Sequence, residues 1–304
     1  MARQKIIIAG GSGFLGHAIL KALRETDTEW VVLTRGESAV RHNISFVHWD
    51  ATTPGEWQEV LEDSTAVINL VGKSVNCRYT EKNKQEIISS RVQATRLIGE
   101  ACRDARHPPK VWINAGSAAI FGDTGDEIKN EDSVPGEGFS PEVCKEWEAA
   151  FHAIDTPRTR KVFLRMGLVF QKGEGLLGPF IKMAKLGLGG AIGSGRQYIS
   201  WVHEQDFTHL IQTAIERDNF SGVIHCVSPY PVTNDQFMKA LRQSLRIPFG
   251  LPNPSLLIKA GAVFIGTEAD LVLSGRRVVS KVLWEKKFPF RFAHIEEALN
   301  HLIG

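Results

Sequence analysis

The sequence predicts an α/β fold, in which a mostly parallel sheet is doubly wound by helices and a small lobe follows at the C-terminus. Three observations lead to this prediction. Short β-branched runs alternate with longer helical patterns through the first two-thirds of the chain, glycines at 10, 13 and 16 separate the first run from the first helical pattern, and the alternation stops near Gly173. Such alternation is typical of βαβ units around a parallel sheet.

Six apolar runs of the first part are the clearest strands. Each is short and is bounded by polar or glycine-containing segments, as expected for buried strands of a parallel sheet. They are Lys5–Ala9, Trp30–Thr34, Ile44–His48, Ala66–Leu70, Val111–Ala115 and Val162–Met166.

Three helices are predicted between these strands, at His17–Thr26, Lys82–Arg106 and Glu142–Ile154. The second carries apolar residues at helical spacing, which predicts a face that packs on the sheet. The residues of this face are Ile87, Ile88, Val92, Thr95, Leu97, Ile98 and Ala101.

The C-terminal part begins with a glycine-rich segment, predicted to be loops around one short helix. A helix at Glu204–Arg217, a strand at Gly222–Val227 and a helix that begins at the capping residues Thr233 and Asn234 and runs to Leu245 follow. After proline breaks at Pro248, Pro252 and Pro254, the last helix is Ile295–Leu302. We therefore predict a nucleotide-binding core at 1–172, and a mixed region at 173–304 that completes the core and forms a smaller substrate-binding lobe.

The segment Gly10–Gly16 lies directly between a buried strand and a helix, with its glycines in a G-x-x-G-x-x-G pattern. In dinucleotide-binding folds such glycines allow a tight turn, a close approach of the backbone to the pyrophosphate, and close packing of the helix on the strand. The helix N-terminus also favours phosphate. The prediction is a Rossmann-type domain whose loop contacts the cofactor through Gly10, Ser12, Gly13, Phe14, Leu15 and Gly16.

The end of the second strand indicates which dinucleotide is preferred. Sites for NAD usually place an acidic residue there to bind the ribose 2′-hydroxyl, whereas this chain has Thr34 and Arg35 and no carboxylate before Glu37. A guanidinium can bind a 2′-phosphate through two hydrogen bonds. NADP(H) is therefore the predicted cofactor, with a solvated surface arginine as the alternative interpretation of Arg35.

Composition excludes several classes of function. The 36 Lys and Arg residues nearly balance 34 Asp and Glu residues, so no nucleic-acid partner is expected. No apolar stretch approaches the roughly 20 residues of a membrane span, and the first strand is too short for a secretory signal. The cysteines are widely spaced, which favours reduced thiols in a cytoplasmic protein without a metal site; they are Cys77, Cys102, Cys144 and Cys226.

Several longer segments resemble one particular family. They are Val67–Gly72, Ser90–Thr95, Trp147–Glu148, Arg165–Phe170, Gly187–His203 with Asp206, and Phe288–Phe292. Together they resemble the atypical extended short-chain dehydrogenases, in the branch of "epimerase family proteins" that is often labelled NAD-dependent epimerase/dehydratase. The resemblance runs essentially from end to end, and Gly187–His203 is its most specific part.

The resemblance implies an NADP(H) site with further contacts. Thr34, Arg35 and Asp50 would meet the adenosine end, the backbone of Leu70, Val71 and Gly72 would line the cofactor, Glu86 and Arg91 would reach it from the long helix, and Val169 would lie near the nicotinamide. From spacing alone, Glu86 and Arg91 would be interpreted as a surface ion pair. By analogy with this class, the helices 82–106 and 142–154 are the candidate faces of a homodimer.

The catalytic residues of short-chain dehydrogenases are only partly present. Ser117 takes the position of the family's serine, with the capping of a turn as its alternative role. Ser140 and Cys144 stand where the Tyr-x-x-x-Lys pair belongs, and Lys145 is one residue too late, about 100° around the helix. The phenol of the family's tyrosine is therefore absent from this position. The three tyrosines are Tyr79, Tyr198 and Tyr230, and none has a lysine four residues later.

Other groups are candidates to substitute for this pair. Cys144 is a candidate nucleophile or acid, although buried cysteine usually only packs. His203 can titrate near neutral pH, although a histidine beside Asp206 more often ties a loop to a helix. Arg196 and Arg276 are candidate anchors for an anionic substrate, or solvated charges.

Two functions follow from this pattern. The first is an oxidoreductase or epimerase that uses NADP(H) on a small or nucleotide-linked substrate. The alternative is an NADP(H)-sensing or regulatory protein that kept the cofactor site without the standard catalytic pair.

Overall fold

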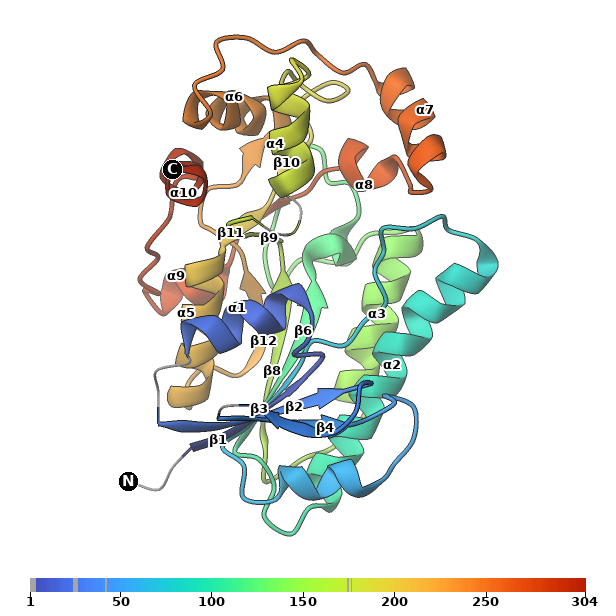
Figure 1. The fold of residues 1–304 in the computed structure, drawn as a ribbon, viewed down its shortest axis with the longest axis vertical. Coiled ribbons are helices and arrows are strands. Elements are labelled where there is room, and N and C mark those ends of the chain that lie inside the picture. The colour runs from blue at the N-terminus through green and yellow to red at the C-terminus, as the bar shows by residue number, and fades with distance from the viewer. Residues whose placement is uncertain (1–3, 24–26, 42, 174, 176) are drawn as a thin grey trace.

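The computed structural model describes residues 4–23, 27–41, 43–173, 175 and 177–304. An eight-stranded sheet forms its centre (Figure 1). All neighbouring strands in it are parallel except β3, which is antiparallel to β4 at one edge. In spatial order the strands are β12 (Gly222–Cys226), β8 (Arg160–Met166), β6 (Val111–Ser117), β5 (Ala66–Asn69), β1 (Gln4–Ala9), β2 (Thr28–Thr34), β4 (Ile44–His48) and β3 (Ala39–Arg41).

Helices cover both faces of this sheet, which confirms the predicted doubly wound class. The helices α1 (Phe14–Ala22) and α5 (Glu204–Glu216) lie on one face, and α2 (Glu81–Asp104) and α3 (Phe139–His152) lie on the other (Figure 1). Alternate residues of β1 divide between the two cores: Ile6 and Ile8 pack on the α1 and α5 side, while Ile7 and Ala9 pack on the α2 and α3 side. A strand buried on both faces must be apolar throughout, which explains the unbroken hydrophobic run in the sequence.

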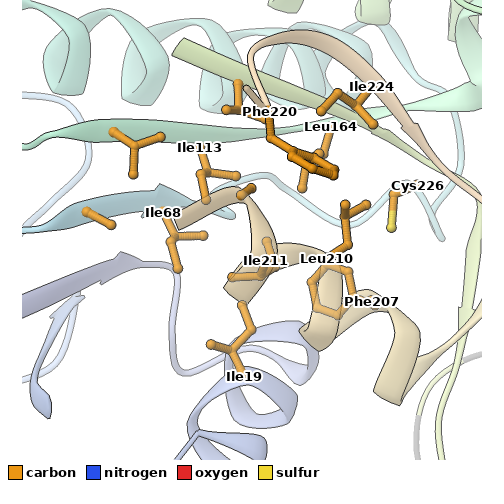
Figure 2. Close-up of a cluster of buried hydrophobic side chains, with 14 of the residues drawn as sticks. Ile19, Ile68, Ile113, Leu164, Phe207, Leu210, Ile211, Phe220, Ile224 and Cys226 are labelled. Carbon is orange, nitrogen blue, oxygen red and sulfur yellow. The ribbon is translucent and has the colours of Figure 1, made fainter. Parts of the chain in front are cut away.

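The core on the α1 and α5 side draws on both parts of the chain (Figure 2). Ile19 and Ile68 come from the first part, whereas Phe207, Phe220 and Ile224 come from beyond residue 200. Strand β12 continues the sheet beside β8 in parallel register. The segments after residue 173 therefore complete the sheet layer before the chain enters its smaller lobe.

A separate core lies in the smaller lobe, where α4 (Leu177–Lys185), α6 (Asn234–Ser244) and α10 (Ile295–Ile303) surround the stacked rings of Phe170 and Phe237. The remaining elements are short. They are η1 (Glu56–Leu61), η2 (Ala118–Phe121), β7 (Ile128–Lys129), β9 (Leu168–Phe170), β10 (Tyr198–Ile199), β11 (Trp201–His203), β13 (Val232–Thr233), α7 (Ser255–Ile265), α8 (Asp270–Leu273), β14 (Arg277–Val278) and α9 (Lys281–Glu285).

The predicted elements of the sheet layer are present, with ends that differ by a few residues. Helix α1 begins at Phe14 instead of His17, and its predicted end at Thr26 lies outside the described residues. Helix α3 begins at Phe139, three residues earlier than predicted, because proline is tolerated in the first turn of a helix and Pro141 does not stop it. None of the described helices combines the length and the apolar character needed to cross a bilayer.

Strand β1 lies between β2 and β5, so the order of strands along the chain reverses beside it. In open α/β sheets ligands bind at the carboxyl ends of the strands beside such a reversal. A ligand site is therefore expected at the segments that follow β1, β2 and β5.

Candidate functional site

The Gly10–Gly16 turn leaves no room for side chains at two of its glycines. Gly10 has a φ of +78°, and a Cβ on it would lie 3.1 Å from the carbonyl carbon of Leu70. A Cβ on Gly16 would lie 2.4 Å from the Cα of Gly11, so a side chain there would push α1 away from β1. The glycine spacing therefore holds the start of α1 against the strand and against the segment that follows β5.

The N-terminus of α1 is open to an anion. Its N-cap is Gly13, no side chain caps the first turn, and no acidic residue lies in that turn. The N–H groups of a first helical turn lack partners within the helix, and the helix dipole adds positive potential at this point. The turn therefore fits the pyrophosphate of a dinucleotide.

The expected adenosine end lies where β2 and β4 finish. Thr34 is the last residue of β2, and its Oγ1 accepts a hydrogen bond from the backbone N–H of Gly36 at 3.2 Å. Arg35 is exposed, and within the described chain its side chain has no hydrogen bond or ion pair. Its guanidinium is therefore available to a ligand.

The carboxylate of Asp50 is engaged by its own loop. It accepts hydrogen bonds from the backbone N–H groups of Thr52 and Thr53, at 2.7 and 2.8 Å, and from the Thr53 hydroxyl at 2.7 Å. These hydrogen bonds hold the pKa of Asp50 well below its usual range. Asp50 therefore organises the turn after β4, and its contact with the adenosine end stays a prediction.

Two open cavities lie at the margins of this region. One of 680 Å³ is lined by Ser38, Trp49 and Asp50, and the other, of 770 Å³, lies between the first turns of α2 and α3. Neither is lined by a residue of the Gly10–Gly16 turn. The candidate site is therefore defined by the geometry of the turn and of the segments beside it.

The segment Leu70–Gly72 runs directly beside the glycine turn. The N–H of Leu70 donates to the carbonyl of Ala9 at 2.9 Å, and the N–H of Val71 donates to Oδ1 of Asn69 at 3.1 Å. These bonds place the backbone of Leu70 and Val71 against Gly10. Their contact with the cofactor stays a prediction.

A buried polar network fixes this segment to the two neighbouring helices. Nδ2 of Asn69 donates to Oδ1 of Asn114 at 2.7 Å and to Oγ1 of Thr95 at 3.2 Å, and the indole of Trp147 donates to the same Thr95 oxygen at 2.9 Å. Such a network rigidifies a site when its buried polar atoms have partners. It therefore joins β5 and β6 to α2 and α3.

Glu86 and Arg91 do not pair with each other, contrary to the interpretation from spacing. The Glu86 carboxylate accepts from Lys73 Nζ, which also donates to Oδ1 of Asn83 at 2.7 Å. The Glu86 side chain is about half-exposed, with an exposed fraction of 43%. Glu86 therefore anchors the loop after β5 to α2 through Lys73, a residue that the sequence analysis did not single out.

Arg91 is largely buried and has no carboxylate partner within the part of the chain that the structure describes. Its Nη1 donates to the carbonyl of Ile87 at 2.8 Å, and its Cζ lies 5.1 Å from the centre of the Trp147 ring. A Cβ on Gly72 would lie 3.0 Å from that same Cζ. The guanidinium therefore lies at the end of the Leu70–Gly72 segment, on the side predicted to face the cofactor.

The positions expected to hold the catalytic pair are on the first two turns of α3. Cys144 is 5% exposed, and it packs in a small apolar cluster that includes Ala118 and Phe121. Burial raises the pKa of the Cys144 thiol to about 11, so the thiol is neutral near pH 7. A neutral buried thiol is inert packing, which argues against the nucleophile or acid expected at Cys144.

Ser117 ends β6 and caps η2, where its Oγ accepts a hydrogen bond from the N–H of Ala119 at 3.1 Å. Ser117 therefore has the turn-capping role that was expected as the alternative to a catalytic role. No acceptor for the Ser117 hydroxyl proton is present among the described residues, and a catalytic role for Ser117 stays a prediction.

Tyr79 lies beside the start of α3, a place that its position in the sequence does not predict. Its ring lies 4.8 Å from that of Phe139 in an edge-to-face arrangement, and its backbone N–H donates to Oε1 of Glu268 at 2.8 Å. Burial raises the pKa of the phenol, and an interaction with the Ser140 hydroxyl partly opposes this. The phenol therefore lies beside Ser140, where the family's tyrosine would be expected.

The two candidate anchor arginines differ in environment. Arg196 is exposed. Arg276 is largely buried, its Nη2 is 3.4 Å from Oγ of Ser274, and its buried Nε has no hydrogen-bond partner among the described residues. Burial lowers the pKa of Arg276, and the thiol of Cys144 and the phenol of Tyr79 lie within reach of its charge.

His203 is fully buried, which argues against the catalytic role considered for it. Its Nδ1 accepts a hydrogen bond from the N–H of Gln205 at 3.0 Å and caps α5. Asp206, three residues further on, accepts from the N–H groups of Arg291 and Phe292 at 2.7 and 3.0 Å. His203 caps α5, and Asp206 ties that helix to the C-terminal segment. Both roles are structural, as in the alternative that a histidine beside Asp206 ties a loop to a helix.

Val169 lies in β9 opposite Val202 of β11, and its side chain is buried in the core on the α1 and α5 side. Its proximity to a nicotinamide stays a prediction.

Comparison with known proteins agrees with this geometry. The sequence profile of the NAD dependent epimerase/dehydratase family matches residues 6–225, and that of a domain of unknown function, DUF1731, matches residues 254–302. The epimerase family protein MT2273 of Mycobacterium tuberculosis is 32% identical over 99% of this chain and 98% of its own length. YfhF of Bacillus subtilis is likewise 32% identical, over 99% and 98% of the two chains.

Solved structures include a similar human protein. The crystal structure of the human epimerase family protein SDR39U1 with NADPH has a TM-score of 0.86 and 28% identity, and covers 99% of both chains. A nucleoside-diphosphate sugar epimerase of Corynebacterium glutamicum has a TM-score of 0.80 and 26% identity, over 100% of this chain and 59% of that one. The resemblance inferred from the sequence motifs is thereby confirmed: this chain belongs to the NAD dependent epimerase/dehydratase family.

Proposed function

We propose that this chain is an NADP(H)-dependent oxidoreductase or epimerase that acts on a small or nucleotide-linked substrate. The observation that carries the proposal is the uncapped Gly10–Gly16 turn, with the unpaired guanidinium of Arg35 at the end of the next strand. The similar human protein was crystallised with NADPH, which supports the choice of cofactor.

The residues present fit this cofactor. The first-turn N–H groups of α1 would hold the pyrophosphate, and Arg35 would bind the 2′-phosphate. The backbone of Leu70–Gly72 would line the cofactor between the turn and Arg91. When bound, the nicotinamide supplies or accepts a hydride at its carbon four, and the protein contributes orientation and a path for the proton.

The first prediction tests the cofactor preference by calorimetry. Wild-type protein should bind NADPH more tightly than NADH, and Arg35→Ala should remove most of that preference. A charge-assisted hydrogen-bonded contact contributes about 1.5–3 kcal/mol, so the loss should be roughly ten- to hundredfold in affinity for NADPH. Binding of NADH should change little.

Arg217→Ala is the matched control, because Arg217 is another exposed arginine, at the far end of α5. It should leave both affinities unchanged. Equal affinities of the wild-type protein for NADPH and NADH would refute the role of Arg35.

The replacement of the standard pair on α3 favours a second candidate, an NADP(H)-sensing protein without catalysis. Ser140 and Cys144 occupy those positions, and the Cys144 thiol is neutral and buried. A panel of aldehydes and α-dicarbonyls, followed by the loss of NADPH absorbance, separates the two candidates. An oxidoreductase should consume NADPH with at least one of these probes, and a sensor should bind it without consumption.

A further inference from the structure

We propose that Tyr79 and Arg91 supply the proton donor and the positive charge that the first turns of α3 lack. Tyr79 would donate its hydroxyl proton to the substrate oxygen, and Arg91 would stabilise the phenolate that remains. The inference rests on the proposed function, because it assigns residues to the nicotinamide end of the same site. Both residues come from α2 and the loop that leads into it.

A continuous series of contacts links the cofactor turn to Arg91. Gly10 is in close contact with the backbone of Leu70 and Val71, and Gly72 is in close contact with the guanidinium of Arg91. The Cζ of that guanidinium also lies 5.1 Å from the centre of the Trp147 ring. Arg91 is thus held beside the segment that would line the cofactor, and among the described residues no carboxylate pairs with its charge.

Tyr79 is held in position from two sides. Thr80, the next residue, caps α2 by accepting a hydrogen bond from the N–H of Asn83 at 3.3 Å. The Tyr79 backbone is bonded to Glu268 of the C-terminal lobe, and its ring packs edge-on against Phe139. These contacts direct the phenol toward Ser140, at the start of α3.

The charges around this phenol suit a proton donor. The groups that face it are Ser140, Cys77, Glu268, Arg91 and Arg276. Burial, the largest effect, raises the pKa of Tyr79 and keeps it protonated near pH 7. Arg91 opposes this shift, because an adjacent positive charge favours the phenolate.

Two buried guanidinium groups therefore face a single neutral phenol. Burying an unpaired charge is costly unless an opposite charge compensates it. In the described parts of the chain neither Arg91 nor Arg276 forms an ion pair, although Asp123 lies within reach of the charge of Arg276 and Glu268 opposes a negative charge on Tyr79. A negative charge that develops on Tyr79 would be stabilised by both guanidinium groups. The two positive charges therefore favour the Tyr79 phenolate, which forms when Tyr79 gives its proton to the substrate.

In the reduction of a carbonyl, Tyr79 would act together with the cofactor. Bound NADPH would supply the hydride to the carbonyl carbon and be left as NADP⁺. The electron pair of the C=O π bond moves to the oxygen, and that oxygen takes the proton of the Tyr79 hydroxyl. The phenolate of Tyr79 then takes a proton from solvent, so one carbonyl, one hydride and one proton yield one alcohol.

The decisive test needs no substrate, because it follows the titration of Tyr79 itself. The chain has three tyrosines, so protein labelled with ¹³C at the tyrosine Cζ gives three signals, which Tyr→Phe variants assign. We expect Tyr79 to titrate at a lower pH with NADP⁺ bound than with NADPH, because the oxidised nicotinamide carries a positive charge. In Arg91→Met its pKa should rise measurably, because an adjacent positive charge that favours the phenolate is lost.

Controls separate the possible failures. Arg91→Lys keeps the charge and should retain the wild-type titration, and Tyr230, which is 49% exposed, should titrate alike with either cofactor. If calorimetry shows NADPH binding but Tyr79 titrates identically with NADP⁺ and NADPH, the inference is overturned while the proposed cofactor site stands. If NADPH does not bind, the proposed function fails and the inference fails with it.

Turnover gives a second test with any carbonyl probe that is reduced. Tyr79→Phe should lower kcat by roughly 10²- to 10⁴-fold, the usual contribution of a general acid, with the Kd for NADPH unchanged. Tyr230→Phe should retain the wild-type rate. An unchanged kcat in Tyr79→Phe would exclude Tyr79 as the proton donor.

Discussion

His203 has the side chain of a physiological acid or base but the surroundings of a core residue. Its ring stacks on that of Phe292 with centroids 3.9 Å apart, and its Nε2 lies 3.1 Å from Nδ1 of His301. Because Nδ1 accepts from Gln205, the proton of the neutral ring is on Nε2. Burial, followed by the charge of His301, lowers the pKa of His203 to about 3.

This environment predicts a loss of stability on mild acidification. Between pH 6.5 and about 3 the unfolded chain binds a proton at His203 and the folded chain does not. The free energy of unfolding should therefore decrease as the pH falls through this window, by up to about 1.4 kcal/mol per pH unit from this residue. Urea unfolding at pH 7 and pH 5 measures the difference.

The variant His203→Asn can still cap α5 and should show a smaller difference between the two pH values. His17→Gln, at an exposed position of α1, should behave as the wild type. If His203→Asn shows the same pH dependence as the wild type, the neutral buried state of His203 is not its cause.

Helix α3 is held to the sheet by an ion pair that the family motifs contain. Arg165 of β8 donates from Nε and Nη2 to the two carboxylate oxygens of Glu148 at 3.0 and 2.9 Å, and the two side chains are only 8% and 13% exposed. His225 of β12 lies 3.4 Å from Nη1 of the same arginine. The Trp147–Glu148 and Arg165 motifs therefore include residues that dock α3 on the sheet.

Removal of one partner of this pair should be strongly destabilising. Glu148→Ala leaves Arg165 buried and unpaired, which we expect to lower the free energy of unfolding by roughly 3–5 kcal/mol. Denaturation in urea measures this, and the double variant Glu148→Gln with Arg165→Met should recover part of the loss.

Asp132→Asn is the matched control for Glu148→Ala. It removes the ion pair between Asp132 and Lys281, in which the side chains are 68% and 49% exposed. Exposed ion pairs contribute at most about 1 kcal/mol to the free energy of unfolding. A comparable loss of stability in both variants would contradict the argument from burial.

The whole molecule is joined through the core on the α1 and α5 side. That core includes Phe207, Leu210 and Ile211 of α5 together with Ile6 and Ile19 from the start of the chain. Strand β12 covers the edge of β8 with five paired residues. The cofactor-binding half therefore depends on segments that follow residue 173 for one face and one edge of its sheet.

We therefore expect residues 1–172 alone to lack a cooperative urea transition, because one sheet face would expose its apolar side chains to water. Circular dichroism during urea unfolding measures this. Adding residues 173–304 as a separate fragment should restore the transition, which distinguishes incomplete burial from simple degradation. A cooperative transition of residues 1–172 alone would show that the first part is an independent domain.

The sequence by itself determined the local elements and the cofactor turn. Patterns of apolar residues and glycines are local, and they suffice to predict β1, the turn after it, α2 and the capped start of α6, where Thr233 accepts from Gln236 as predicted. The shorter strand pairs β9–β11, β10–β13 and β14–β7 were not predicted. Strands of two or three residues have little periodicity of their own and depend on partners distant in the chain.

Only the tertiary structure decided which polar side chains are buried together. Sequence spacing paired Glu86 with Arg91, whereas the fold places Lys73 beside Glu86 and Trp147 beside Arg91. It also brings Tyr79 to the start of α3, 61 residues away from Ser140 along the chain and beside Arg276 of the C-terminal lobe. Burial and the electrostatic surroundings of a side chain arise from segments remote in sequence, and therefore no local pattern reveals them.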